Sequence, residues 1–185
     1  MNRVLKLVIA VAGVSVASVA TVAAQGAHFG VGGGLTSPLS DFKDQDKTGW
    51  HGLARVDLSI PLSPVAVRVD GMYAQTSHQA TYSSDGNTKL IGGLASVVWK
   101  VPVPAPMVKP YVLAGGGVYN VKTTAPSLSL DTSVTKFAYA FGAGVNLGAG
   151  PLHLFVEGRY VSIQTEGKAI KFVPVTAGVM FGAGK

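Results

Sequence analysis

The sequence predicts an all-β protein: an eight-stranded antiparallel up-and-down transmembrane β-barrel, preceded by a cleavable signal peptide. Three observations predict it. Apolar side chains after the N-terminal segment recur every second residue, the period of a β-strand, and no stretch convincingly follows the helical period. Short Pro- or Gly-marked turns alternate with polar loops, most of them longer, as they do in membrane barrels. Charged residues make up 13% of the chain, about half the share that is typical of soluble domains.

The N-terminal segment has the composition of a secretory signal peptide. Arg3 and Lys6 precede the charge-free run VIAVAGVSVASVATVAA, whose last residues, Val22 to Ala24, are small where signal peptidase cleaves. We therefore expect residues 1–24 to be the signal peptide and residues 25–185 to form the barrel domain. The alternative is an uncleaved anchor, but the run is at the short limit for a spanning helix.

Eight segments of the mature chain follow the strand period. They cover residues 27–35, 50–60, 65–76, 88–100, 110–122, 136–147, 152–164 and 171–181. Their lengths are close to the ~9–11 residues that a tilted strand needs to cross a bilayer. An even number of strands places both chain ends on the side of the short turns, which is the periplasmic side.

The period of two also fits a soluble, lipocalin-like barrel, so the character of the two faces decides. In segment 136–147 one face is apolar and aromatic, whereas the other carries mostly small residues that suit the narrow lumen of an eight-stranded barrel. Aromatic residues near the strand ends are expected at the membrane–water boundaries. These are Trp50, Tyr73, Trp99, Tyr111, Tyr119, Tyr160 and Phe181. A membrane barrel is favoured, since a closed barrel pairs every backbone group in lipid.

Four segments resemble the small outer-membrane β-barrel family that includes OmpA-type and OmpX-type porin-like proteins. They are FGVGGGLTSPLSDF, KPYVLAGGGVY, EGRYV and the closing VPVTAGVMF. The resemblance implies insertion into the outer membrane of a Gram-negative cell. It also implies that Gly178, Val179 and Phe181 belong to a signal read by the barrel insertion machinery. The chain departs from the family pattern in that GAGK follows the aromatic Phe181.

Acidic and arginine side chains alternate with apolar residues in three of the segments. With the aromatic faces turned to lipid, these charges point into the lumen, where they must be paired or hydrated. The expected lumen network is Arg55, Asp57, Arg68, Asp70, Lys136, Glu157 and Arg159. Other polar residues that would join it are His28, His51, Asn120, Lys122 and His153. We interpret the network as a plug of ion pairs; an acid/base site or an ion path is the alternative.

Nothing in the sequence identifies a catalytic, cofactor or metal site. There is no cysteine, and the 4 histidines do not form a metal-binding motif. A lipid-modifying enzyme at the extracellular rim would need a nucleophile beside its base. Its candidate residues are Ser77, His78, Ser83, Ser84 and Asp85. Lysines and arginines are not clustered, so we expect no nucleic-acid partner.

The expected function is that of a non-enzymatic outer-membrane protein, structural or interacting with surface partners, with a largely closed lumen. The alternative is a small porin-like channel for ions or solutes. The expected partners are outer-membrane lipid and lipopolysaccharide, the insertion machinery, and a surface partner bound through loops 36–49, 77–87 and 123–135.

Overall fold

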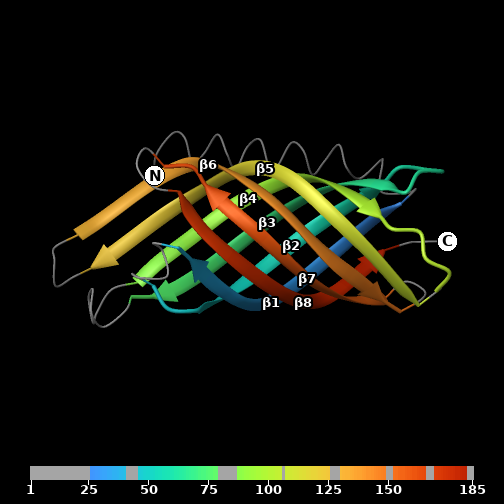
Figure 1. Cartoon of the computed structure of the whole chain (residues 1–185), viewed down its shortest axis with the longest axis horizontal. Coiled ribbons are helices and arrows are strands. Elements are labelled where there is room, and N and C mark those ends of the chain that lie inside the picture. The colour runs from blue at the N-terminus through green and yellow to red at the C-terminus, as the bar shows by residue number, and fades with distance from the viewer. Residues whose placement is uncertain are drawn as a thin grey trace.

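The computed structural model describes residues 26–40, 46–78, 87–105, 107–125, 130–148, 152–165 and 169–182. They form eight strands (Figure 1), which are β1 (Ala27–Leu39), β2 (Gly49–Ser59), β3 (Val65–Ser77), β4 (Asn87–Lys100), β5 (Val108–Ala125), β6 (Leu130–Leu147), β7 (Leu152–Ile163) and β8 (Ile170–Gly182). The expected signal peptide, residues 1–24, lies outside the described residues.

The strands form one closed barrel in which each strand pairs antiparallel with its neighbours in the sequence. β1 closes the barrel against β8, and its register places Val31 opposite Val179. The predicted all-β, eight-stranded up-and-down barrel is therefore confirmed. Within the described part of the chain, no helix has the length and hydrophobicity needed to span a membrane.

The hairpin of β5 and β6 is longer than predicted. Both strands have 18 residues, so most of the expected loop 123–135 is strand and that boundary was wrong. The β-branched residues Thr123, Thr124 and Val134 continue the ladder, in which Thr123 pairs with Thr132. β1 likewise continues to Leu39, into the expected loop 36–49. In Figure 1 the hairpin extends beyond the other strands at the end of the barrel opposite the chain's C-terminus.

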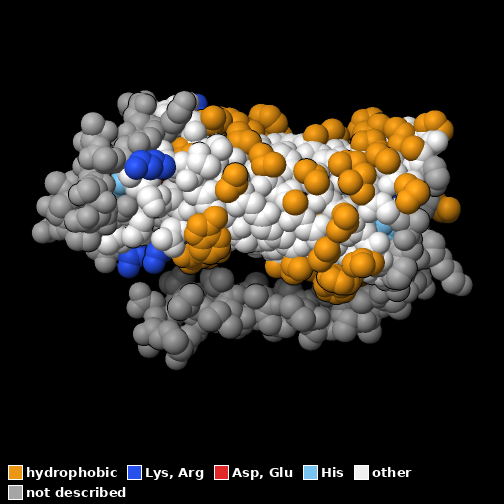
Figure 2. Space-filling model, turned by 90° about the horizontal axis from the view of Figure 1, so that it is seen from below, with side chains coloured by type: hydrophobic (Ala, Val, Ile, Leu, Met, Phe, Trp, Pro, Cys, Tyr) orange, Lys and Arg blue, Asp and Glu red, His pale blue; other side chains and the backbone are white. Residues whose placement is uncertain are grey.

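The outward face is apolar along the length of the strands. Large side chains that are half exposed or more include Val31, Leu35, Val69, Ile91, Val97, Val118, Phe137, Leu154 and Val175. Figure 2 shows hydrophobic side chains spread over the barrel wall, with Lys and Arg side chains near one end. Such an exposed apolar surface far exceeds the patches that soluble monomers tolerate.

The lumen is a packed core. Most of its buried apolar side chains form one cluster, and a smaller cluster comprises Ala66, Val98, Tyr111 and Leu113. Inward glycines make room for the rings: a Cβ at Gly92 would lie 2.4 Å from the ring of Tyr119. This filled interior is what an eight-stranded barrel can hold.

Candidate functional site

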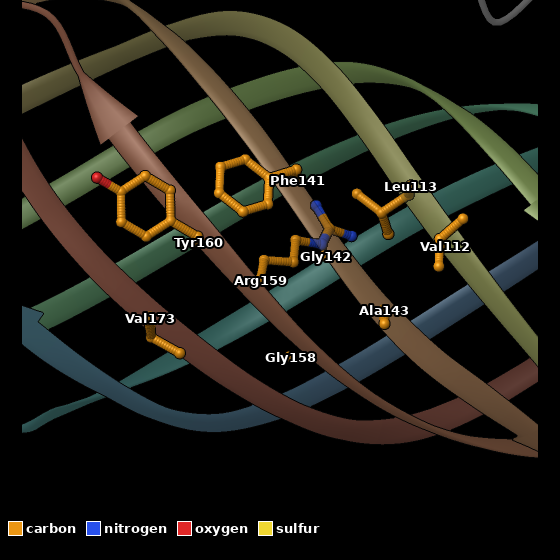
Figure 3. Close-up of a pocket in the computed structure, with 9 residues that line it drawn as sticks. All are labelled: Val112, Leu113, Phe141, Gly142, Ala143, Gly158, Arg159, Tyr160 and Val173. Carbon is orange, nitrogen blue, oxygen red and sulfur yellow. The ribbon is translucent and has the colours of Figure 1, made fainter.

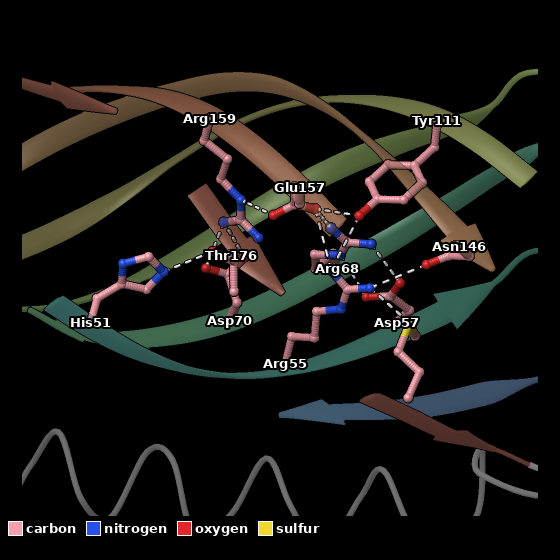
Figure 4. A network of polar contacts seen from close by, with 11 residues as sticks. His51, Arg55, Asp57, Arg68, Asp70, Tyr111, Asn146, Glu157, Arg159 and Thr176 are labelled. Atoms are coloured by element: carbon pink, nitrogen blue, oxygen red, sulfur yellow. Dashed lines mark hydrogen bonds and ion pairs between the residues drawn. The ribbon is translucent and has the colours of Figure 1, made fainter. Parts of the chain in front are cut away.

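Six charged side chains from β2, β3 and β7 meet in the lumen (Figure 4). We call Arg55, Asp57, Arg68, Asp70, Glu157 and Arg159 the ion-pair plug. The register of β2 and β3 places Arg55 opposite Asp70 and Asp57 opposite Arg68. Opposite charges on facing positions stabilise a strand pair, so the pairing of these two strands already brings four of the six together.

Two of the arginines each hold one aspartate through both carboxylate oxygens. Arg68 donates from Nε to Asp57 Oδ1 at 2.6 Å and from Nη2 to Oδ2 at 2.7 Å. Arg159 Nη1 lies 2.8 Å from each oxygen of Asp70. The planar guanidinium suits such contacts because several donors lie in one plane.

Glu157 connects all three arginines. Its Oε2 accepts from Arg55 Nη1 at 3.2 Å and also from Arg68 Nη1, while Oε1 accepts from Arg159 Nε. The Tyr111 hydroxyl donates to Oε2 at 2.7 Å. Glu157 lies on β7, across the lumen from β2 and β3, so it joins the two sides of the barrel.

The plug is buried and balanced in charge. Its most exposed member, Asp57, has 6% of its surface accessible. Three arginines face three carboxylates, so the net charge is zero when all six are ionised. Aromatic rings lie against the cations: the Arg55 guanidinium carbon lies 3.6 Å from the ring centroid of Phe155, and that of Arg68 lies 5.0 Å from the ring centroid of Tyr111. Buried ions of this kind are stable only when paired.

Two aromatic residues predicted for the membrane interface lie in the lumen instead, so those two predictions were wrong. Tyr111 and Tyr119 are each only 1% exposed. Tyr111 points inward because its hydroxyl pairs with Glu157, and Tyr119 because its ring fills the space beside Gly92. They share the inward face of β5 with Leu113, and Val112 and Val118 face outward.

The other five predicted interface aromatics lie on the outward face. Trp50, Trp99 and Phe181 are about half exposed, at 54%, 48% and 50%. The half-buried rings of Tyr73 and Tyr160 pack on neighbours, with Tyr73 beside Trp50 and Tyr160 stacked on Phe141 at 4.9 Å between centroids. The predicted insertion-signal residues Gly178, Val179 and Phe181 lie on β8, opposite β1.

Lys136 lies towards the long-loop end of β6. It is half-buried and is six residues from Gly142, the register partner of Arg159. At about 3.3 Å per residue, this separation along β6 is some 20 Å. Asn120 follows the inward Tyr119 on β5 and so points outward, where its side chain bonds Thr135 and Ser133 and not the lumen network. Lys122 lies two residues further along the same strand.

The histidines occupy three different places. His51 is buried beside the plug and bridges β1 and β8, with Nδ1 3.0 Å from Thr36 Oγ1 and Nε2 2.8 Å from Thr176 Oγ1. His28 and His153 lie together at the short-turn end. His78 lies at the opposite end, next to Asp46.

A buried polar cluster at the long-loop end was not predicted from the sequence. Asp46 accepts from Thr76 Oγ1 at 2.8 Å and from Thr88 Oγ1 at 3.2 Å, and His78 Nε2 lies 3.2 Å from the same Thr88 oxygen. Burial raises the pKa of Asp46 above its usual value, although the bonds from the threonines and the nearby His78 oppose that shift. Of the proposed rim residues, Ser83, Ser84 and Asp85 lie outside the described residues. No group of three metal-ligating side chains occurs among the residues that the structure describes.

A shallow depression lies on the outward face over β6 and β7 (Figure 3). It encloses about 550 Å³ and its floor includes Gly158 and Ala143. Phe141 and Tyr160 stand beside it, and Val112 and Val173 complete its apolar rim. The ladder between β7 and β8 is interrupted here at Arg159 and Tyr160. Arg159 is level with Pro174, which has no N–H to donate.

Several solved structures are similar to this chain in fold. The crystal structure of Neisserial surface protein A has a TM-score of 0.68 at 17% identity, covering 85% of this chain and 97% of that one. The attachment invasion locus protein Ail of Yersinia pestis has a TM-score of 0.52 at 21% identity, covering 85% and 99%. The N-terminal β-barrel domain of Pseudomonas aeruginosa OprF has a TM-score of 0.51 at 13% identity, covering 85% and 98%.

None of the curated protein sequences that were compared matches the chain. The family model described as outer membrane protein beta-barrel domain matches residues 8–182, nearly all of the sequence. The apolar outer wall, the closed eight-stranded sheet and this match agree: the chain belongs to the outer-membrane β-barrel family, and its location is the outer membrane.

Proposed function

We propose that this chain is a non-enzymatic barrel whose lumen is closed by the ion-pair plug. Its role is to strengthen the envelope and to present its long-loop end to a surface partner. The observation that carries the proposal is Glu157, which contacts Arg55 and Arg68 across the lumen and Arg159 on its own strand. An ion that crossed the barrel would have to separate these buried pairs, at several kcal/mol for each unpaired charge.

Planar-bilayer recording tests whether the plug is closed. Purified protein should show no steady conductance. Glu157→Gln removes the charge that links the two sides, and it should produce intermittent openings. Lys89→Met changes one charge at the long-loop end of β4, outside the plug, and serves as the control. Steady conductance of the unaltered protein would establish the small porin-like channel instead.

The absence of enzyme activity is part of the proposal and has its own test. The buried cluster at the long-loop end contains a hydroxyl, an imidazole and a carboxylate, but Thr88 is only 2% exposed. A substrate could not reach its oxygen without displacing the neighbours that bond it. Lipid A from cells that produce His78→Ala should match lipid A from cells with the unaltered protein. An altered acylation pattern would identify a lipid-modifying enzyme.

Three interactions follow from this role. Lipid and lipopolysaccharide contact the outward apolar face, including the depression over Gly158. The insertion machinery binds β8 through the segment that contains Gly178, Val179 and Phe181. A surface partner binds at the long-loop end, within the segments 36–49, 77–87 and 123–135; in these, residues 41–45, 79–86 and 126–129 lie outside the described residues.

Export and insertion can be tested separately. If residues 1–24 are removed on export, the mature protein begins at Gln25, and measurement of its intact mass would detect this. Phe181→Ala should lower the amount of folded barrel, seen as less of the heat-shifted band on a denaturing gel. Phe29→Ala changes the residue opposite it on β1 and is the matched control for loss of a ring.

A further inference from the structure

A polar cavity of about 190 Å³ lies at the short-turn end of the lumen. We call it the periplasmic cup; its lining includes His28, Ser59, Lys100, Lys109, Asn146 and His153. All six lie within two residues of a strand end on that side. We propose that the periplasmic cup binds a phosphate group.

The cup has an excess of positive charge. Lys100 and Lys109 both line it, and the described lining contains one carboxylate, that of Asp57. Both oxygens of Asp57 are held by Arg68, at 2.6 and 2.7 Å. The aspartate is therefore neutralised from within the plug, and the two lysines are left to attract an anion from the cup's open side.

Two residues of the cup retain hydrogen-bond donors beyond the bonds described for them. Lys100 Nζ donates one bond, to Ser59 Oγ at 2.7 Å, and an ammonium has three N–H groups. Asn146 Oδ1 faces Arg55 Nη2 at 3.4 Å, which leaves the amide NH₂ as a donor.

The acceptors that Met180 and Asp57 contribute to the wall are already engaged. Met180 Sδ accepts a hydrogen bond from Arg55 Nη2 at 2.7 Å. The two Asp57 carboxylate oxygens accept hydrogen bonds from Arg68 Nε and Nη2. A ligand that only accepts hydrogen bonds and carries negative charge fits this surface. Phosphate oxygens have both properties, and charge-assisted bonds from ammonium groups are the strong ones.

The size of the cup agrees with a small ligand. Its volume of about 190 Å³ corresponds to roughly six water molecules at about 30 Å³ each, enough for one phosphate group with some water. Asp57, a member of the plug, forms part of the wall. The ligand would enter and leave by the same opening, so the cup is a binding site and does not depend on conduction through the barrel.

Phosphate groups reach this side of the membrane from two sources: free inorganic phosphate and the headgroups of the periplasmic leaflet. NMR of the amide-labelled protein separates them. In the first arm, the protein in neutral detergent is titrated with inorganic phosphate against chloride at equal ionic strength. In the second arm, nanodiscs of phosphatidylcholine, whose phosphate is balanced by the choline cation, are compared with nanodiscs that also contain phosphatidylglycerol, whose phosphate leaves a net negative charge.

The expected result is saturable, phosphate-specific shifts of the Ser59, Lys100 and Asn146 amide signals. Lys100→Met and Lys109→Met should each weaken binding by about tenfold, since each removes one charge-assisted contact worth about 1.4 kcal/mol or more. Lys89→Met makes the same change at the far end of the barrel and should bind normally. Heat-shifted mobility on a gel verifies that each variant is folded, and exposed Lys109 gives a variant with little risk to folding.

Shifts in the second arm alone would assign the phosphate to a lipid headgroup. Shifts in the first arm alone would assign it to a soluble anion. Either outcome supports the site. Shifts that chloride reproduces, or that both lysine variants retain at full strength, would overturn it.

Discussion

The hydroxyl of Tyr111 donates to Glu157 Oε2 at 2.7 Å, and both residues are only 1% exposed. Tyr111 comes from β5 and Glu157 from β7, so the bond reaches past β6 inside the lumen. The tyrosine ring also faces the Arg68 guanidinium. Tyr111 thus supports the plug from outside its six residues, and it occupies the side of Glu157 that faces β5.

Replacing Tyr111 by Phe should destabilise the barrel while leaving its shape unchanged. The ring remains, but a buried carboxylate loses a donor, which costs about 1.5–3 kcal/mol for a hydrogen bond to a charged group. Urea unfolding of the protein in lipid vesicles would show a lower midpoint at an unchanged slope.

Tyr160→Phe is the matched control, because Tyr160 lies on the outward face and stacks on Phe141. It should change the midpoint by less than Tyr111→Phe does. Equal effects of the two substitutions would show that the bond from Tyr111 to Glu157 does not stabilise the barrel.

The strand count could be predicted from the period of two, and the inward direction of the charges could be predicted because charges mark a face. In β2 and β7, Arg55 and Glu157 alternate with apolar neighbours, so one face of each strand had to be the lumen. β5 has no such marker. Its two faces, with Tyr111 and Leu113 on one and Val112 and Val118 on the other, are about equally apolar, and the period of two cannot say which faces lipid.

The buried cluster at the long-loop end could not be predicted for a different reason. Asp46 and His78 lie 32 residues apart in segments without periodicity, and an isolated bridge brings them together. Composition predicts polar loops but not which of their side chains become buried. The pairing of Arg159 with Asp70, 89 residues apart, likewise depends on barrel closure and on which side chains reach across the lumen.

Removing Arg159 should be among the most destabilising single changes in the lumen. Arg159→Ala leaves Asp70 without its bidentate partner and takes one cation from Glu157. Breaking a buried pair in this way costs about 3–5 kcal/mol. The urea midpoint in vesicles should fall accordingly, whereas Lys89→Ala, at the long-loop end of β4, should leave it nearly unchanged. An unaltered midpoint for Arg159→Ala would contradict the burial of the pair.

Two glycines on opposite faces should respond differently to a methyl group. In Gly92→Ala the new Cβ would lie 2.4 Å from the Tyr119 ring, whereas at Gly158 it would meet nothing within 4 Å. Displacing a packed ring costs about 1–3 kcal/mol, so Gly92→Ala should lower the unfolding midpoint. Gly158→Ala should leave stability unchanged or raise it slightly, because alanine loses less backbone entropy on folding. The reverse order would show that Tyr119 does not fill the space beside Gly92.

The contact between Asp46 and the strand ends should weaken as pH rises. Burial raises the pKa of Asp46 above its unfolded value, so the folded state favours the protonated carboxyl. The stabilisation is fully present below the unfolded pKa and is lost as pH rises through the folded pKa.

Hydrogen exchange of the Lys47 amide, which donates to the Ser77 carbonyl at 2.8 Å, reports on this contact. After correction for intrinsic exchange, protection in the unaltered protein should fall as the pH rises above about 4, relative to Asp46→Asn, whose side chain does not titrate. His78 Nε2 lies 3.9 Å from Asp46, so the same comparison in a His78→Gln background isolates the carboxyl. If the two proteins kept the same ratio of protection at every pH in that background, Asp46 would not be the titrating group.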